Sequence, residues 1–227
     1  MARQHLMVLD RRNARCRKCR SMNLNVQSLS VLVALTLRDP ANAARLVIAA
    51  VYRRDILWTF LLLVSIANAA LVWLSNALTG PTPEQLAQMP IQIPQIIFSP
   101  LFAFVFLAGA MVITVHVLHW IGAAIGGEGS LDDMLSVLVW LQAMRVLAQV
   151  VLLVLLLVAP TIAGLFGLAV ALFSLWILVH CVNEGAGLGS VFKTVGVLLS
   201  ATVGIIMGLS FILTITGLAS MGISPNV

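Results

Sequence analysis

Five long apolar runs constrain the fold of this chain more than any other feature of its sequence. A helix needs about 20 mostly apolar residues to cross the hydrocarbon core of a bilayer. The runs lie at about residues 56–78, 100–125, 134–158, 162–182 and 195–220. With 61% hydrophobic and only 9% charged residues, a water-soluble domain could not cover such a core with polar surface. The sequence therefore predicts an all-α membrane protein with five transmembrane helices.

The basic residues are concentrated at one end of the chain. Eleven of the 13 Lys and Arg residues precede residue 55. Because basic residues flank spans on the cytoplasmic side, we expect the N-terminus in the cytoplasm and, after five crossings, the C-terminus outside. The predicted outer segments 79–95 and 159–161 contain no Lys or Arg, and Lys193 falls in a predicted inner loop. These features favour a multi-pass protein of the cell (inner) membrane.

Three regions follow from this charge pattern. Residues 1–21 form a basic head without apolar periodicity. We expect it to be disordered; the alternative is an over-extended start, with Met22 as the true start. Anionic lipids are the expected partner of this head, at roughly 1 kcal/mol per basic residue near the surface; nucleic acid is not expected. Residues 22–54 are predicted to form one or two short amphipathic helices, either in the membrane interface or packed on the loops. Residues 55–227 form the membrane domain.

The second of these short helices has a clear start signal. Asp39 is a residue type that caps helices, and Pro40 suits the first turn, where its missing N–H is not needed. A similar signal begins the third span, where Ser130 with Asp133 three residues later resembles a capping box. Both helices should therefore begin at these positions.

Arg145 is a charged residue inside a predicted span, where charge is costly and often marks function. Gln142, Arg145 and Gln149 follow an i, i+3, i+7 spacing and share one helix face. We expect this candidate polar stripe to point into the bundle, where a substrate or proton path could use it. The alternative, which we favour, is a structural Arg145 that snorkels. If the span proper starts at Val139, Arg145 is six residues deep, about 9 Å at 1.5 Å per residue.

Acidic and imidazole side chains gather at the predicted cytoplasmic ends of the spans. His, Asp and Glu at such spacings could bind a divalent metal or relay protons. The alternative, which we favour, is that polar residues collect at any span end, so no metal and no cofactor is predicted. This candidate ring comprises His116, His119, Asp132, Asp133, His180 and Glu184.

Two glycine patterns and one cysteine pair resemble known motifs. Gly185, Gly187 and Gly189 resemble a phosphate loop, but no strand precedes them, so the sequence indicates a plain loop. Gly204 and Gly208 are spaced for close helix approach, and we favour packing within the chain over dimerisation. Cys16 and Cys19 are half of a zinc pattern without a second pair. No catalytic residue set is recognised, and we expect no enzyme.

The two predicted inner hairpins resemble each other and also resemble a known family. Each ends a span with His, turns through glycines and opens the next span with Ser. The segments Gly126-Gly-Glu-Gly-Ser-Leu131, Val179-His-Cys-Val-Asn-Glu184 and Gly187-Leu-Gly-Ser-Val-Phe-Lys193 resemble the Yip family of five-span membrane proteins, over about residues 24–220. Bacterial relatives also contain a step like Leu37-Arg-Asp-Pro40 and begin close to a sequence like that at Met22.

In eukaryotes the family implies membrane trafficking, with binding of prenylated Rab-type GTPases and self- and hetero-association in the bilayer. The acidic, aromatic Gly-Pro motif that precedes the first span in eukaryotic members is absent here. The resemblance therefore implies the architecture rather than GTPase binding, and no catalytic residue is carried over.

Two functional hypotheses follow. The first is a non-enzymatic scaffold, of the membrane-organising or trafficking type, that associates with other membrane proteins or with itself. The alternative is a small cation or proton carrier or channel that uses Arg145 and the candidate ring.

Overall fold

A computed structural model describes residues 26–50, 52–80 and 99–215. The predicted basic head 1–21 and most of the predicted outer segment 79–95 lie outside the described residues. Within these ranges the chain forms seven helices and no strand. Five of the helices are long and apolar enough to cross a membrane. The predicted all-α fold with five spans is therefore confirmed, and two short helices precede the spans as expected.

The two short helices are α2 (Val26–Arg38) and α3 (Pro40–Ala49). The Asp39 side chain accepts a hydrogen bond from the backbone N–H of Asn42 at 3.1 Å, and Pro40 occupies the first turn of α3. The expected start signal is thus used. Each helix buries one side, with Leu32 of α2 and Ala43 and Val47 of α3 buried. Leu29, Val31 and Leu37 of α2 are apolar but exposed.

The five long helices are α4 (Arg54–Thr79), α6 (Pro100–Ala124), α7 (Leu131–Val158), α8 (Pro160–Ala186) and α9 (Val191–Ile215). Several extend beyond the predicted apolar runs, because hydropathy marks only the part of a helix that lies in hydrocarbon. At 1.5 Å per residue, α7 is about 42 Å long, which exceeds the roughly 30 Å of a hydrocarbon core. The predicted end of the fifth span lies outside the described residues.

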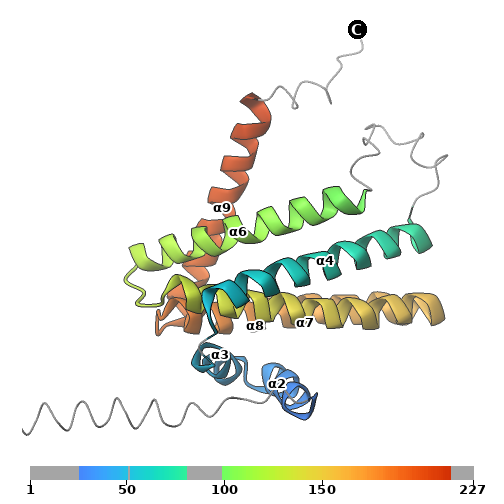
Figure 1. Ribbon diagram of the computed structural model, residues 1–227, viewed down its shortest axis with the longest axis horizontal. Coiled ribbons are helices and arrows are strands. Elements are labelled where there is room, and N and C mark those ends of the chain that lie inside the picture. Colours follow the sequence, from blue (N-terminus) through green and yellow to red (C-terminus); the bar gives the residue numbers. More distant parts are fainter. Residues whose placement is uncertain (1–25, 51, 81–98, 216–227) are drawn as a thin grey trace, which may run out of the picture.

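The five long helices meet at one end of the molecule, which we call the base. The starts of α4, α7 and α9 and the ends of α6 and α8 lie there, and the opposite ends form the far end (Figure 1). Helix α4 packs on α6 and α7, α7 packs on α8, and α9 packs on α6 and α8. Figure 1 shows α4, α7 and α8 side by side, whereas α9 rises steeply away from them.

The core is concentrated at the base. One cluster of buried side chains joins all five long helices and includes Leu61 of α4, Val115 of α6, Leu138 of α7, Val182 of α8 and Val197 of α9. Beyond Ala201, none of the α9 side chains that the structure describes is buried. The far half of the molecule therefore exposes mainly apolar side chains, as expected for surfaces that contact lipid tails rather than water.

Candidate functional site: the base and the polar seam

The two loops of the base dock directly on each other. The N–H of Gly129 donates a hydrogen bond to the carbonyl of Ala186 at 3.0 Å. A Cβ added at Gly129 would lie 2.1 Å from the carbonyl oxygen of Gly185, and one at Gly127 would lie 2.4 Å from that of Ala186. Gly187 ends α8 in the left-handed region, with φ of 62°. The two similar hairpins recognised in the sequence therefore form one glycine-lined backbone junction.

Side-chain caps fix the helices that leave this junction. Ser130 and Asp133 form a complete capping box at the start of α7, as predicted. The side-chain oxygen of Asn183 accepts hydrogen bonds from the N–H of Ser190 at 3.0 Å and from the Thr194 hydroxyl at 2.9 Å. Asn183 thus ties the end of α8 to the start of α9, and Thr194 is fully buried there.

Helices α2 and α3 are attached to the base by three polar contacts. Arg45 donates two hydrogen bonds to the carboxylate of Glu184, each at 2.8 Å, from Nε to Oε2 and from Nη2 to Oε1. These bonds raise the pKa of the Arg45 guanidinium above its usual value. The Cys181 thiol lies 3.5 Å from the carbonyl oxygen of Pro40. Nε1 of Trp140 donates to the Thr36 hydroxyl at 3.0 Å.

The candidate ring residues lie in the same half of the molecule but take separate partners. Asp132 pairs with Arg54 at 3.1 Å, Asp133 caps α7, and Glu184 binds Arg45. The imidazole of His116 stacks on Trp58, with ring centroids 6.4 Å apart. The His180 ring lies 5.1 Å from that of Trp176 on its own helix.

His119 is half-buried near the end of α6. Within the part of the chain that the structure describes, no three His, Cys, Asp or Glu side chains are grouped closely enough to hold a metal ion. The base therefore brings these residues into helix-to-helix contacts and caps. A catalytic or transporting role for them stays a prediction.

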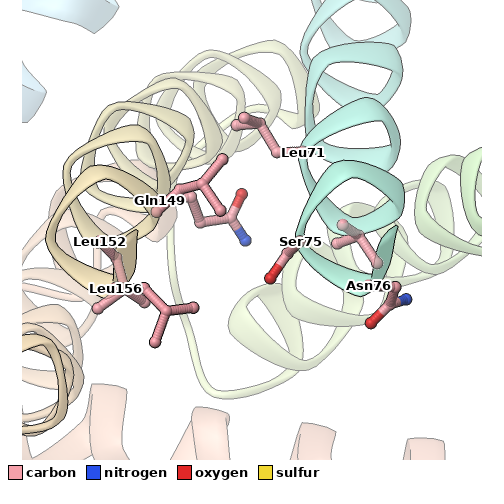
Figure 2. A pocket seen from close by; sticks show the side chains of 8 residues that line it. Leu71, Ser75, Asn76, Gln149, Leu152 and Leu156 are labelled. Atoms are coloured by element: carbon pink, nitrogen blue, oxygen red, sulfur yellow. The ribbon is translucent and has the colours of Figure 1, made fainter. Parts of the chain in front are cut away.

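The candidate polar stripe of α7 faces helix α4 at two of its three positions. The Asn68 amide of α4 lies 3.5 Å from Oε1 of Gln142, whose Nε2 lies 2.8 Å from the sulfur of Met111. Farther from the base, Gln149 lines a cavity between α4 and α7 (Figure 2). We call this line of polar groups the polar seam; it consists of Asn68, Ser75, Asn76, Gln142 and Gln149.

Arg145 lies between the two glutamines in the stripe but takes no partner. Its side chain is exposed, and within the described residues it makes no hydrogen bond or ion pair. It is 14 residues from the start of α7 and 13 from its end, about 20 Å from either end at 1.5 Å per residue. A charged side chain at the centre of a span costs about 2.5–3.5 kcal/mol on insertion scales. Arg145 is therefore the least compensated charge that the structure describes.

The glycine pair of α9 also has no close neighbour among the described residues. A Cβ added at Gly204 or Gly208 would meet nothing within 4 Å. The described helices therefore do not use this face for close packing, and it stays open to another helix or to lipid.

Sequence reasoning missed three of the contacts described above. The Arg45–Glu184 pair joins residues 139 positions apart, and nothing local in the sequence signals such a pairing. Asn68 is an amide residue near the middle of a span, which could have been recognised as a partner for the α7 stripe. The role of Asn183 could have been found from its place beside the glycines that end α8.

The described residues define a class: a polytopic α-helical membrane protein with a glycine-lined loop junction at one end and two amphipathic helices docked beside it. Residues 34–219 match the family model of the Yip1 domain, so the chain belongs to this family. The match includes α3 and all five long helices, and it confirms the resemblance found in the loop motifs. No curated protein and no solved structure matches the chain significantly.

Proposed function

We propose that this Yip1 domain protein is a non-enzymatic scaffold of the inner membrane, with α2, α3 and the base in the cytoplasm and the C-terminus outside. The observation that carries this proposal is the docking of α2 and α3. They are held on α7 and α8 by the Arg45–Glu184 and Trp140–Thr36 contacts and still expose Leu29, Val31 and Leu37. Such a fixed platform with an apolar outer face suits assembly with partner proteins at the membrane surface.

The use of polar groups at the base supports the same proposal. Asp132 and Glu184 pair with arginines and Asp133 caps α7. The rings of His116 and His180 each lie against a tryptophan ring. These groups stabilise the arrangement of the helices, which is what a scaffold requires. An enzyme or carrier would instead need them to converge on one substrate position.

Affinity purification from a mild detergent, followed by identification of co-purifying proteins, tests the proposal. We expect defined membrane proteins, or further copies of this chain, to be retained by the wild type and lost from a Val31→Asp variant. Val31 is 67% exposed, so the change should leave the fold intact. Phe192→Asp is the matched control, because it places the same charge on another exposed apolar residue. Recovery of the bare protein alone, or equal losses from both variants, would contradict the proposal.

A cation or proton carrier is the second candidate, and the polar seam is the observation that favours it. If Arg145 and the adjoining seam form an ion path, Arg145→Leu should abolish ion flux into proteoliposomes while the co-purifying proteins remain. Flux that is absent in the wild type would eliminate this candidate and would leave the scaffold untouched.

A further inference from the structure

The cavity between α4 and α7 is the least explained feature of the molecule. It has a volume of about 190 Å³ and lies toward the far end, close to the last residues of both helices. Its lining mixes leucines with three polar residues, Ser75, Asn76 and Gln149. Figure 2 shows the amide of Gln149 and the hydroxyl of Ser75 projecting into the space between the two helices. The complete lining is Leu71, Val72, Ser75, Asn76, Gln149, Leu152, Leu153 and Leu156.

One polar atom in this cavity requires a donor. The side-chain oxygen Oε1 of Gln149 is buried and accepts no hydrogen bond from the described residues. Since buried polar atoms in native structures nearly always have a partner, a molecule that donates a hydrogen bond is expected in the cavity. Its volume would hold about six waters or one small headgroup, and it is far too small for a helix.

Arg145 lies directly on the base side of this cavity. Gln149, Leu152 and Leu156 line it, and they follow Arg145 by four, seven and eleven residues. These spacings put all four on one face of α7. Gln149 is thus one helical turn from Arg145, within reach of the long arginine side chain.

No carboxylate among the described residues lies close to Arg145. The nearest acidic residue along α7 is Asp133, twelve residues away, or about 18 Å, and it is used in the capping box. The other described carboxylates also lie at or near the base, and those of Asp55, Asp132 and Glu184 pair with arginines. The described part of the chain therefore supplies no counter-ion for Arg145, and a ligand or a lipid can provide one.

The apolar part of the lining indicates what carries this anion. Five of the eight lining residues are apolar, four of them leucines, and Val72, which also lines the cavity, is 36% exposed on the outer surface of the helices. A ligand with a hydrocarbon tail could thus enter sideways from the bilayer. We infer that the slot between α4 and α7 binds the headgroup of an anionic phospholipid, with Arg145 against the phosphate and Gln149 accepting a hydrogen bond from a headgroup hydroxyl.

The inference can be tested by native mass spectrometry on the full chain, delipidated in detergent and titrated with phosphatidylglycerol or phosphatidylcholine. We expect phosphatidylglycerol to be retained more tightly. Arg145→Gln should weaken that binding by about tenfold or more, because it removes a charge-assisted hydrogen bond. The matched control is Lys193→Gln, which removes a cation at the base end of α9 and should leave binding unchanged. Equal binding by the two variants would overturn the inference.

Two further measurements locate the binding site and identify the anion. Ser75→Phe fills the slot from α4 and leaves Arg145 in place, so it should also reduce phosphatidylglycerol retention; undiminished retention would refute the slot as the site. Glycerol 3-phosphate offers the same phosphate without a tail. If it competes as strongly as the lipid, the site recognises a soluble anion, and the assignment to a phospholipid is wrong. A thermal unfolding curve for each variant establishes that it is folded.

Discussion

At the scale of single residues, the glycines of the base are required by the close approach of two backbones. The N–H of Gly129 reaches the carbonyl of Ala186 at 3.0 Å, and any side chain at position 129 would meet the carbonyl oxygen of Gly185. The resemblance to a phosphate loop is thus coincidental in this fold. Glycine serves here because it lacks a Cβ. Gly187 and Gly189 lie in the predicted loop, whereas Gly185 lies in the last turn of α8.

This close approach predicts a large effect for a small substitution. Gly129→Ala should lower the free energy of unfolding by about 1–3 kcal/mol, the usual range for overpacking, because the added methyl group must push the two loops apart. Thermal unfolding in detergent measures it, with Tm falling roughly 2–4 °C per kcal/mol for a chain of this size.

Gly196→Ala is the control for this measurement. A Cβ at Gly196 meets nothing within 4 Å in the α9 helix, so alanine there should be neutral or should stabilise by about 0.5–1 kcal/mol. If both variants unfold at the same temperature, the loop junction contributes less than its geometry indicates.

At the scale of helices, the sequence predicted the elements well and their partners poorly. Hydropathy, Pro40, Ser130 and the terminal glycines are local signals, and each marks a helix or a helix end that the structure contains. The pairing of Arg45 with Glu184 and the seam between Asn68 and Gln142 depend on which helices become neighbours. In a chain where nearly every helix face is apolar, periodicity carries little information about packing.

The Arg45–Glu184 pair should control the attachment of α3 to the bundle. Arg45→Glu places two carboxylates together, so we expect several-fold faster backbone hydrogen exchange in α2 and α3, measured by mass spectrometry. The double variant Arg45→Glu with Glu184→Arg restores opposite charges and should restore protection.

A neighbouring arginine supplies the control for this experiment. Arg53 pairs only locally with Asp55, and both side chains are 81% exposed, so Arg53→Glu should leave exchange in α2 and α3 unchanged. Fast exchange in the double variant would show that the carboxylate pairing is not what holds α3.

Substitutions on the open glycine face of α9 should change association between helices without changing the stability of the fold. Gly204→Leu and Gly208→Leu add side chains where no described residue lies within 4 Å of the added Cβ, so the Tm should stay close to that of the wild type. If a second copy or a partner helix uses this face, the bulk should prevent close helix approach and reduce energy transfer between labelled copies in liposomes. Gly109→Leu is the control, since its position on α6 is equally open. Unchanged energy transfer would mean that α9 contacts lipid here.

At the scale of the whole molecule, charge and packing are both concentrated at one end. The described acidic and basic residues lie at or near the base, except for Arg145, and the core that joins all five long helices is there too. The base therefore holds the helices together, while the far half contacts lipid and α9 diverges from its neighbours (Figure 1). This asymmetry explains why a carrier site cannot be recognised from polar residues alone: most of them stabilise the base.

Because the number of spans is odd, the N-terminus and the C-terminus should lie on opposite sides of the membrane, and this can be measured. With the basic N-terminal region inside, the base loops should face the cytoplasm and the C-terminus should face outward. In a background without native cysteines, Asn226→Cys should react with a membrane-impermeant maleimide on intact spheroplasts. Glu128→Cys, in an exposed base loop, should react only after lysis, and its labelling after lysis is the control for accessibility. Labelling of both positions from the same side would require an even number of crossings, and reversed labelling would place the α2–α3 platform outside the cell.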